Sequence, residues 1–237
     1  EQIALTLEQI MSDPDWLGRQ AESPSFSADG QYISYSRKQA GSVLRERFIA
    51  DPLNAGNGEK VALSEQHLYD YDQRIDDEDS EYIAWLFEGN VFAMNKRSKQ
   101  VKQLTKSSAG ARNLAFLNDD AVSFQRGDTF YAVNMASGMQ KELLSWQFAD
   151  KPEAVEAPKD HVAKEQLRLI KYVQVQRENR QVRADAKVAL QQANSSMIAA
   201  PVYLPKGHTT VVASLSPDGK WAVIATREDL PTRNDTD

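Results

Sequence analysis

Short apolar runs that follow polar turns recur along the chain. Residues 27–35 read Ser-Ala-Asp-Gly-Gln-Tyr-Ile-Ser-Tyr, and residues 216–224, which begin 189 positions later, read Ser-Pro-Asp-Gly-Lys-Trp-Ala-Val-Ile. Each copy places a Ser-x-Asp-Gly turn before β-branched and aromatic residues, the pattern of a strand after a tight turn. Two further copies of the strand, with more divergent turns, lie at 82–85 and 121–124.

A second apolar run follows each of the first three copies and ends in Asp or Asn, at 48–51, 92–95 and 131–134. The last two runs come after Gly89-Asn90 and Gly127-Asp128. Such dipeptides tolerate positive φ and predict hairpin turns.

A third element is predicted around Leu63, Leu104 and Leu143. Asn95 and Asn134 are 39 positions apart, as are Leu104 and Leu143. A period of about 40–50 residues is typical of a propeller blade.

The repeat predicts the fold class. A short four-stranded sheet buries its faces only by stacking on neighbouring sheets. We therefore expect an all-β fold, a partial β-propeller of about three and a half four-stranded blades with a long helical insertion. The expected blades lie at 22–65, 70–106 and 112–146, with a partial blade at 198–227. A β-sandwich is the alternative, but a sandwich has no reason to repeat at a fixed period.

Two segments do not follow the repeat. Residues 3–12 predict a short helix with a capping box formed by Thr6 and Gln9, packed as a lid on the first blade. Asp13-Pro14 ends this helix.

Residues 160–195 are rich in strong helix formers and contain neither Gly nor Pro. Asp160 is the predicted N-cap. The apolar positions at helical spacing are Leu167, Ile170, Val173, Val182, Ala186, Ala189, Leu190 and Ala193. The pattern is interrupted at 178–180, so one bent helix and a helical hairpin both fit. The segment is an insertion or arm that contacts a partner subunit or the substrate entrance, or that lies along the propeller rim.

These patterns divide the chain into three parts. Residues 1–158 hold the N-terminal helix and the first three blades, 159–196 the helical insertion, and 197–237 the start of a further blade.

Composition and charge narrow the function. The 237 residues carry a net charge of −6, which argues against general nucleic-acid binding. No Cys is present, so disulfide and thiolate chemistry are excluded. No apolar run reaches the ~20 residues of a membrane span. The chain starts at Glu1 rather than Met, which is what removal of a leader predicts.

No residue is predicted to be catalytic, to bind a cofactor or to ligate a metal. The acidic run 76–79 lacks the spacing of an EF-hand and is expected to be a solvated loop. His67, His161 and His208 are scattered and form no zinc-type pair. Neither a Gly-rich phosphate loop nor a dinucleotide fingerprint occurs.

The repeat residues resemble a known family. Ser-x-Asp-Gly before a strand, Gly-Asn or Gly-Asp before the next, and Gln103-Leu104-Thr105 are similar to TolB-type propeller repeats. The opening Leu-Thr-Leu-Glu-Gln-Ile-Met at 5–11 and Asp-Trp-Leu-Gly at 15–18 resemble the mature N-terminus of bacterial secreted prolyl oligopeptidase-family peptidases, on the dipeptidyl peptidase IV side. The resemblance implies a periplasmic or secreted protein.

In that family the propeller admits peptides to a serine hydrolase domain, whose chemistry needs a Gly-x-Ser-x-Gly elbow. This sequence has none, so the resemblance implies a C-terminal α/β-hydrolase domain after residue 237. The fourth repeat stops after two strands, so the sequence holds about three and a half blades. Single-chain propellers usually have 4–8 complete blades. The dipeptidyl branch holds the substrate's amine with a Glu pair, and no Glu-Glu occurs here, so the specificity is not carried over.

The expected partners are peptide substrate through the parent enzyme, the hydrolase domain, and a second copy bound through helix 160–195 or an open blade edge. The alternative function is a non-catalytic TolB-like scaffold that binds protein partners in the periplasm. A sugar-cleaving propeller lyase would need His-rich metal ligands, which three scattered His do not supply.

Overall fold

The computed structural model describes residues 18–54, 56, 58–118, 120–151, 167–194 and 196–229. The chain divides into two compact units, Glu1–Leu114 and Ala115–Asp237. The predicted helix at 3–12, together with Asp160 and His161, lies outside the described residues.

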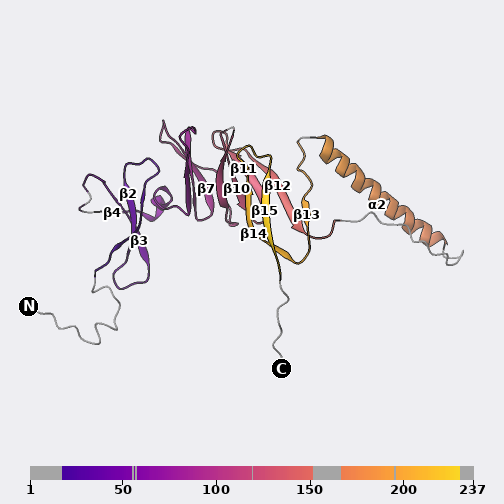
Figure 1. The fold of residues 1–237 in the computed structure, drawn as a ribbon, viewed down its shortest axis with the longest axis horizontal. Coiled ribbons are helices and arrows are strands. Elements are labelled where there is room, and N and C mark those ends of the chain that lie inside the picture. Colours follow the sequence, from indigo (N-terminus) through magenta and orange to yellow (C-terminus); the bar gives the residue numbers. More distant parts are fainter. Residues whose placement is uncertain are drawn as a thin grey trace, which may run out of the picture. The chain divides into compact units, whose positions relative to one another are not determined.

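The first unit holds two antiparallel four-stranded sheets, each with its strands in chain order (Figure 1). The first sheet consists of β1 (Ala21–Phe26), β2 (Ile33–Lys38), β3 (Arg45–Ala50) and β4 (Glu59–Lys60). The second consists of β5 (Gln73–Asp76), β6 (Tyr82–Phe87), β7 (Asn90–Asn95) and β8 (Val101–Gln103). A 3-10 helix, Leu63–Leu68, connects them.

The third sheet runs through β9 (Arg112–Leu117), β10 (Ala121–Arg126), β11 (Thr129–Asn134) and β12 (Gln140–Phe148), again in chain order. A fifth strand, β13 (Val202–Leu204), pairs in parallel with β12, and Trp146 lies opposite Val202. The hairpin of β14 (His208–Leu215) and β15 (Ala222–Glu228) forms a separate two-stranded sheet. Three four-stranded meanders followed by half of another confirm the predicted all-β, partial-propeller class.

Three local predictions are wrong. Val202–Leu204 belongs to the third sheet and not to the partial blade at 198–227, because Leu204 packs with the buried Phe130 and Trp146. Leu63 begins the 3-10 helix instead of a strand. The β6–β7 turn is centred on Glu88-Gly89, since Phe87 pairs with Asn90.

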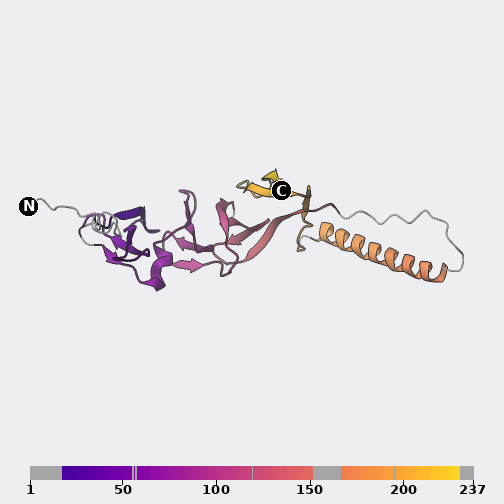
Figure 2. The ribbon, with the colours of Figure 1, turned by 90° about the horizontal axis from the view of Figure 1, so that it is seen from below.

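The insertion contains one uninterrupted helix, α2 (Leu167–Ala193) (Figure 2). The structure therefore has a single helix here and not a helical hairpin. Its 27 residues span about 40 Å at 1.5 Å per residue. The side chains of Leu167, Ile170 and Val173 lie outside the described residues. From 175 to 194 every described side chain is exposed or half-exposed. No helix among the described residues is both long and apolar enough to cross a membrane.

Each unit has a core built by stacking one sheet on another. In the first unit, Ala28 of the first Ser-x-Asp-Gly turn packs against Ile83, Trp85, Phe92 and Met94 of the second sheet. This contact buries apolar surface that neither sheet could bury alone.

In the second unit, Ala213 of β14 packs on Phe130 and Trp146 of the third sheet. The indole Nε1 of Trp146 donates a hydrogen bond of 2.9 Å to Thr210 Oγ1, which in turn donates to Asp128 Oδ1 at 3.1 Å. The hairpin is thus held on the third sheet by both apolar and polar contacts.

The two Ser-x-Asp-Gly turns are copies down to their hydrogen bonds. Ser27 Oγ donates to Asp29 Oδ1 (2.5 Å) and accepts from Tyr32 N (3.0 Å). The second copy has the same two bonds, from Ser216 Oγ to the carboxylate two residues on (2.6 Å) and from the amide five residues on (2.9 Å). Gly30 and Gly219 adopt positive φ of 73° and 70°. The repeated sequence therefore encodes one self-contained turn that starts a strand.

Candidate functional site

Each of the three large sheets carries a stacked pair of aromatic rings on neighbouring strands. The register of β2–β3, β6–β7 and β10–β11 places the two rings of each pair directly opposite each other. The pairs are Tyr35 with Phe48 (ring centroids 5.6 Å apart, planes 14° apart), Trp85 with Phe92 (6.0 Å, 12°) and Phe124 with Tyr131 (5.6 Å, 20°). The repeat thus places an equivalent aromatic pair in each sheet.

An arginine covers this pair in two of the three sheets. The guanidinium carbon of Arg37 lies 4.1 Å from the centroid of Phe48. That of Arg126 lies 5.2 Å from Phe124 and 5.9 Å from Tyr131. Both arginines stand two residues after the first aromatic residue of their pair. Such geometry is a cation–π contact.

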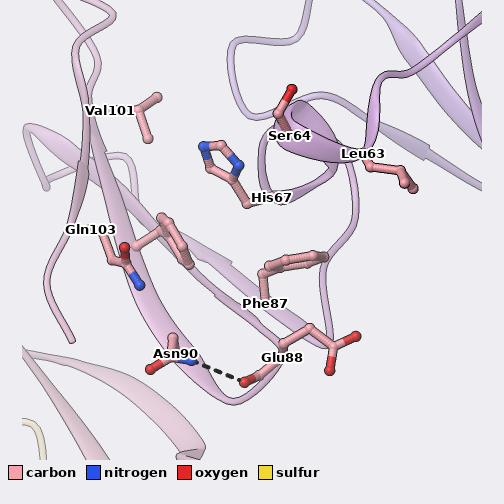
Figure 3. Close-up of a pocket in the computed structure, with 9 residues that line it drawn as sticks. Leu63, Ser64, His67, Phe87, Glu88, Asn90, Val101 and Gln103 are labelled. Carbon is pink, nitrogen blue, oxygen red and sulfur yellow. Dashed lines mark hydrogen bonds between the residues drawn. The ribbon is translucent and has the colours of Figure 1, made fainter. Parts of the chain in front are cut away.

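The equivalent position of the second sheet is Phe87, and a pocket opens there (Figure 3). The pocket has a volume of about 420 Å³ and lies in the first unit. It is lined by Leu63, Ser64, His67, Phe87, Glu88, Asn90, Phe92, Val101 and Gln103.

The 3-10 helix forms one wall of this pocket, and two contacts position it. The indole Nε1 of Trp85 donates a hydrogen bond of 2.8 Å to the carbonyl of His67. The imidazole of His67 stacks on Phe92 at 5.2 Å and lies 6.4 Å from Phe87. Leu63 is 83% exposed at the start of the same helix. The pocket therefore has three aromatic rings and an open aliphatic edge.

A tyrosine holds the end of the 3-10 helix against the second sheet. Tyr71 donates a hydrogen bond of 2.5 Å from its hydroxyl to the carbonyl of Leu68, and its ring lies 5.7 Å from Trp85. Burial of the phenol raises the pKa of Tyr71 to about 12. The neutral phenol is thus part of the support on which the pocket wall rests.

Most of the polar groups at the rim are already engaged by the backbone. Asn90 accepts from the amide of Ser107 (2.8 Å) and donates to the carbonyl of Glu88 (3.1 Å). Gln103 Nε2 donates to the carbonyl of Thr105 (2.9 Å). Glu88 is exposed, and its carboxylate makes no ion pair with any described residue. It is the acidic group of a pocket whose lining contains no lysine or arginine.

The other residues weighed from the sequence lie elsewhere. His208 opens β14, and its Nδ1 is 3.1 Å from the carbonyl of Lys206. In the acidic run, Asp76 forms ion pairs with Lys96 (2.9 Å) and Arg74 (3.3 Å). Across the described part of the chain, no three His, Asp or Glu side chains are grouped as metal ligands would be.

A second cavity, of about 540 Å³, lies in the second unit beside the other Ser-x-Asp-Gly turn. Asp218 lines it, and the hydrogen bond from Ser216, followed by that from the amide of Lys220, holds the pKa of this carboxyl below its usual range. This carboxylate is therefore already engaged by the turn.

Comparison with known proteins finds fold neighbours alone. Neither a protein-family model nor a curated protein sequence matches the chain. Among solved structures, Hsv2 of Kluyveromyces lactis matches 54% of this chain and 37% of its own at 12% identity and a TM-score of 0.30. TolB of Acinetobacter baumannii matches 53% and 32% at 17% identity and 0.29.

Oligogalacturonate lyase of Vibrio parahaemolyticus matches 53% of this chain and 35% of its own at 16% identity and a TM-score of 0.25. The chain thus spans about a third of the length of these structures. The fold class rests on the sheets themselves.

The sequence repeat itself contains a signal for the pocket. Aligning the three strand copies places Arg37, Phe87 and Arg126 at one position of the repeat. No catalytic motif marks this position, because an arginine or a phenylalanine occupies it in each copy. In the sequence His67 is an isolated histidine, whereas the fold brings its imidazole onto Phe92.

Proposed function

We propose that this chain is the non-catalytic propeller portion of a secreted or periplasmic serine peptidase, which binds and positions peptides for a separate α/β-hydrolase domain. The proposal starts from the resemblance of the repeats and of the N-terminal stretch to the prolyl oligopeptidase family. The pocket of the first unit is the observation that carries it on this chain. An aromatic hollow of about 420 Å³ at the end of a strand hairpin is of the size and chemistry that accept a peptide side chain.

The pocket's chemistry suits binding and not bond cleavage. The lining contains the hydroxyl of Ser64 and the imidazole of His67, but the ring of His67 is stacked on Phe92. The sequence also has no Gly-x-Ser-x-Gly elbow that would present a strained serine. The rings and the Glu88 carboxylate instead supply contact area and charge. The reaction itself is assigned to the hydrolase domain.

Two preparations test this proposal. The natural full-length protein should hydrolyse dipeptidyl or prolyl chromogenic substrates, and the 237-residue chain should not. Turnover by the 237-residue chain that one Ser→Ala substitution within it abolishes would overturn the proposal. So would a natural full-length protein that cleaves none of these substrates.

The exposed hairpin favours a second candidate function, a TolB-like scaffold that binds protein partners. Trp221 and Val223 are 75% and 68% exposed on the hairpin formed by β14 and β15. Exposed apolar groups of this size are typical of protein-binding surfaces. The open reading frame of the gene distinguishes the two candidates. Codons for a Gly-x-Ser-x-Gly motif downstream of Asp237 support the peptidase, and a stop codon there supports the scaffold. Cell fractionation tests the periplasmic or secreted location that both candidates share.

A further inference from the structure

The second sheet differs from its two copies by the lack of an arginine over its aromatic pair. Arg37 and Arg126 each place a guanidinium over rings of their own sheet, whereas Phe87 occupies that position in the second sheet. Phe87 lies 6.4 Å from Phe92 in a near-perpendicular arrangement, and the imidazole of His67 stacks on Phe92 at 5.2 Å, so these two rings flank Phe92 where an arginine covers the pair in the other sheets. The open pocket is found at this place.

We propose that the pocket over Phe92 binds the guanidinium of an arginine side chain supplied by a peptide. This specificity rests on the proposed peptide-binding function and names the side chain that the pocket selects. The bound guanidinium takes the part that Arg37 and Arg126 play within their own sheets.

The charges around the pocket favour a cation. Glu88 is exposed at the turn that borders the pocket, makes no described ion pair and is not opposed by any lysine or arginine of the lining. A guanidinium on the rings of Phe87 and Phe92 is attracted by their π faces and by this carboxylate. In Figure 3 Phe87 and His67 border the same space, with Gln103 and Asn90 at its polar edge.

The shape of the pocket favours arginine over lysine. A guanidinium is planar, stacks on aromatic faces and is weakly hydrated, whereas an ammonium is a compact and strongly hydrated charge. The methylene stem of an arginine also finds the apolar Val101 and Leu63 beside the rings. His67 already covers part of Phe92 at 5.2 Å, so the bound guanidinium lies beside the imidazole, toward Phe87.

The first test compares three blocked peptides of equal length, acetyl-Gly-X-Gly-amide, with X as arginine, lysine or citrulline. Each is titrated into the 237-residue chain by isothermal calorimetry or NMR. Citrulline keeps the shape of arginine and removes its charge. The arginine peptide should bind roughly five- to thirtyfold more tightly than the citrulline peptide, with the lysine peptide between them. Equal affinities, or no binding of the arginine peptide, would overturn the inference.

Substitutions at the pocket test whether the arginine peptide binds there. Phe87→Arg gives the second sheet the arginine of its copies and should abolish binding by filling the site. Glu88→Gln should weaken arginine binding about two- to fivefold. Glu78→Gln is the matched control, because it removes one exposed carboxylate from the same unit outside both the lining and the 3-10 helix, and it should leave affinity unchanged. If Phe87→Arg does not fold, Glu88→Gln and Phe92→Leu decide in its place, and undiminished arginine binding in both would refute the site.

These results are separable from the proposed function. If the full-length protein cleaves peptides but the 237-residue chain binds the arginine and citrulline peptides equally, the arginine specificity is wrong and the peptidase proposal stands. If the chain selects the arginine peptide but the full-length protein cleaves no peptide, the arginine pocket stands and the peptidase proposal is wrong.

Discussion

Two turns that are otherwise copies differ in the residue type at their left-handed position. Asn95 Oδ1 accepts the amide of Ser98 at 2.9 Å, and Asn134 Oδ1 accepts that of Ser137 at 2.7 Å. The next residue has positive φ in both turns, 57° at Lys99 and 76° at Gly138. A side chain in this conformation costs roughly 1–2 kcal/mol, which glycine avoids.

Lys99→Gly should therefore stabilise the protein. We expect a gain of about 0.5–1 kcal/mol in the free energy of unfolding, because the removed strain exceeds the added chain entropy. Urea denaturation followed by far-UV circular dichroism measures it. The reverse change, Gly138→Lys, should destabilise by a similar amount. A destabilised Lys99→Gly would contradict the equivalence of the two turns.

A second prediction concerns Tyr71, whose pKa burial raises from the usual 10 to about 12. The fold favours the neutral phenol, so its contribution to stability is complete below pH 10 and is lost as the pH rises from 10 to 12. Tyr71→Phe cannot ionise, and its urea midpoint should fall less than that of the wild type over this interval. Parallel slopes for the two proteins would show that Tyr71 is not buried as described.

At the scale of elements, the Ser-x-Asp-Gly turn gives a matched pair of substitutions. Ser27 and Ser216 make the same two side-chain hydrogen bonds, but Ser27 is 1% exposed and Ser216 is half-exposed. Ser27→Ala should cost about 1–3 kcal/mol, because Asp29 and the Tyr32 amide lose a partner away from water. Ser216→Ala should cost less, since water replaces its hydroxyl.

The midpoints of unfolding of the two variants in guanidinium chloride or urea measure this difference. Equal losses would mean that burial does not set the strength of the turn.

Elements whose pairing is local could be predicted from the sequence. The strands at 33–38, 82–87 and 121–126 follow their own turns and pair with the next strand, so pattern and turn chemistry suffice. β13 has three residues and pairs in parallel across the helical insertion, which no local pattern records. The pocket could not be predicted from local patterns either, because it depends on a 3-10 helix at Leu63–Leu68 and on the residue type at Phe87.

At the scale of the whole molecule, we expect self-association through the hairpin of β14 and β15. Val212, Trp221 and Val223 are each more than half exposed there. Among the described residues β15 pairs only with β14, whereas the equivalent β2 has two partners. Such an edge invites pairing with a second copy. Light scattering after size exclusion should show a dimer or larger species that Val223→Lys weakens.

The helix provides the control for this prediction. Val182 is also exposed, on α2, so Val182→Lys should leave the assembly unchanged when the hairpin is the interface. A monomer at high concentration, or a dimer weakened only by Val182→Lys, would rule out the hairpin as the contact.

The molecule consists of copies of one sheet unit, and the pocket marks the copy that lacks its own arginine. A crystal structure of the Phe87→Arg variant tests this most directly. The new guanidinium carbon should lie about 4–6 Å from the centroid of Phe92, as in the other two sheets, and close the pocket. A side chain that extends into solvent and leaves the pocket open would contradict the equivalence of the three sheets.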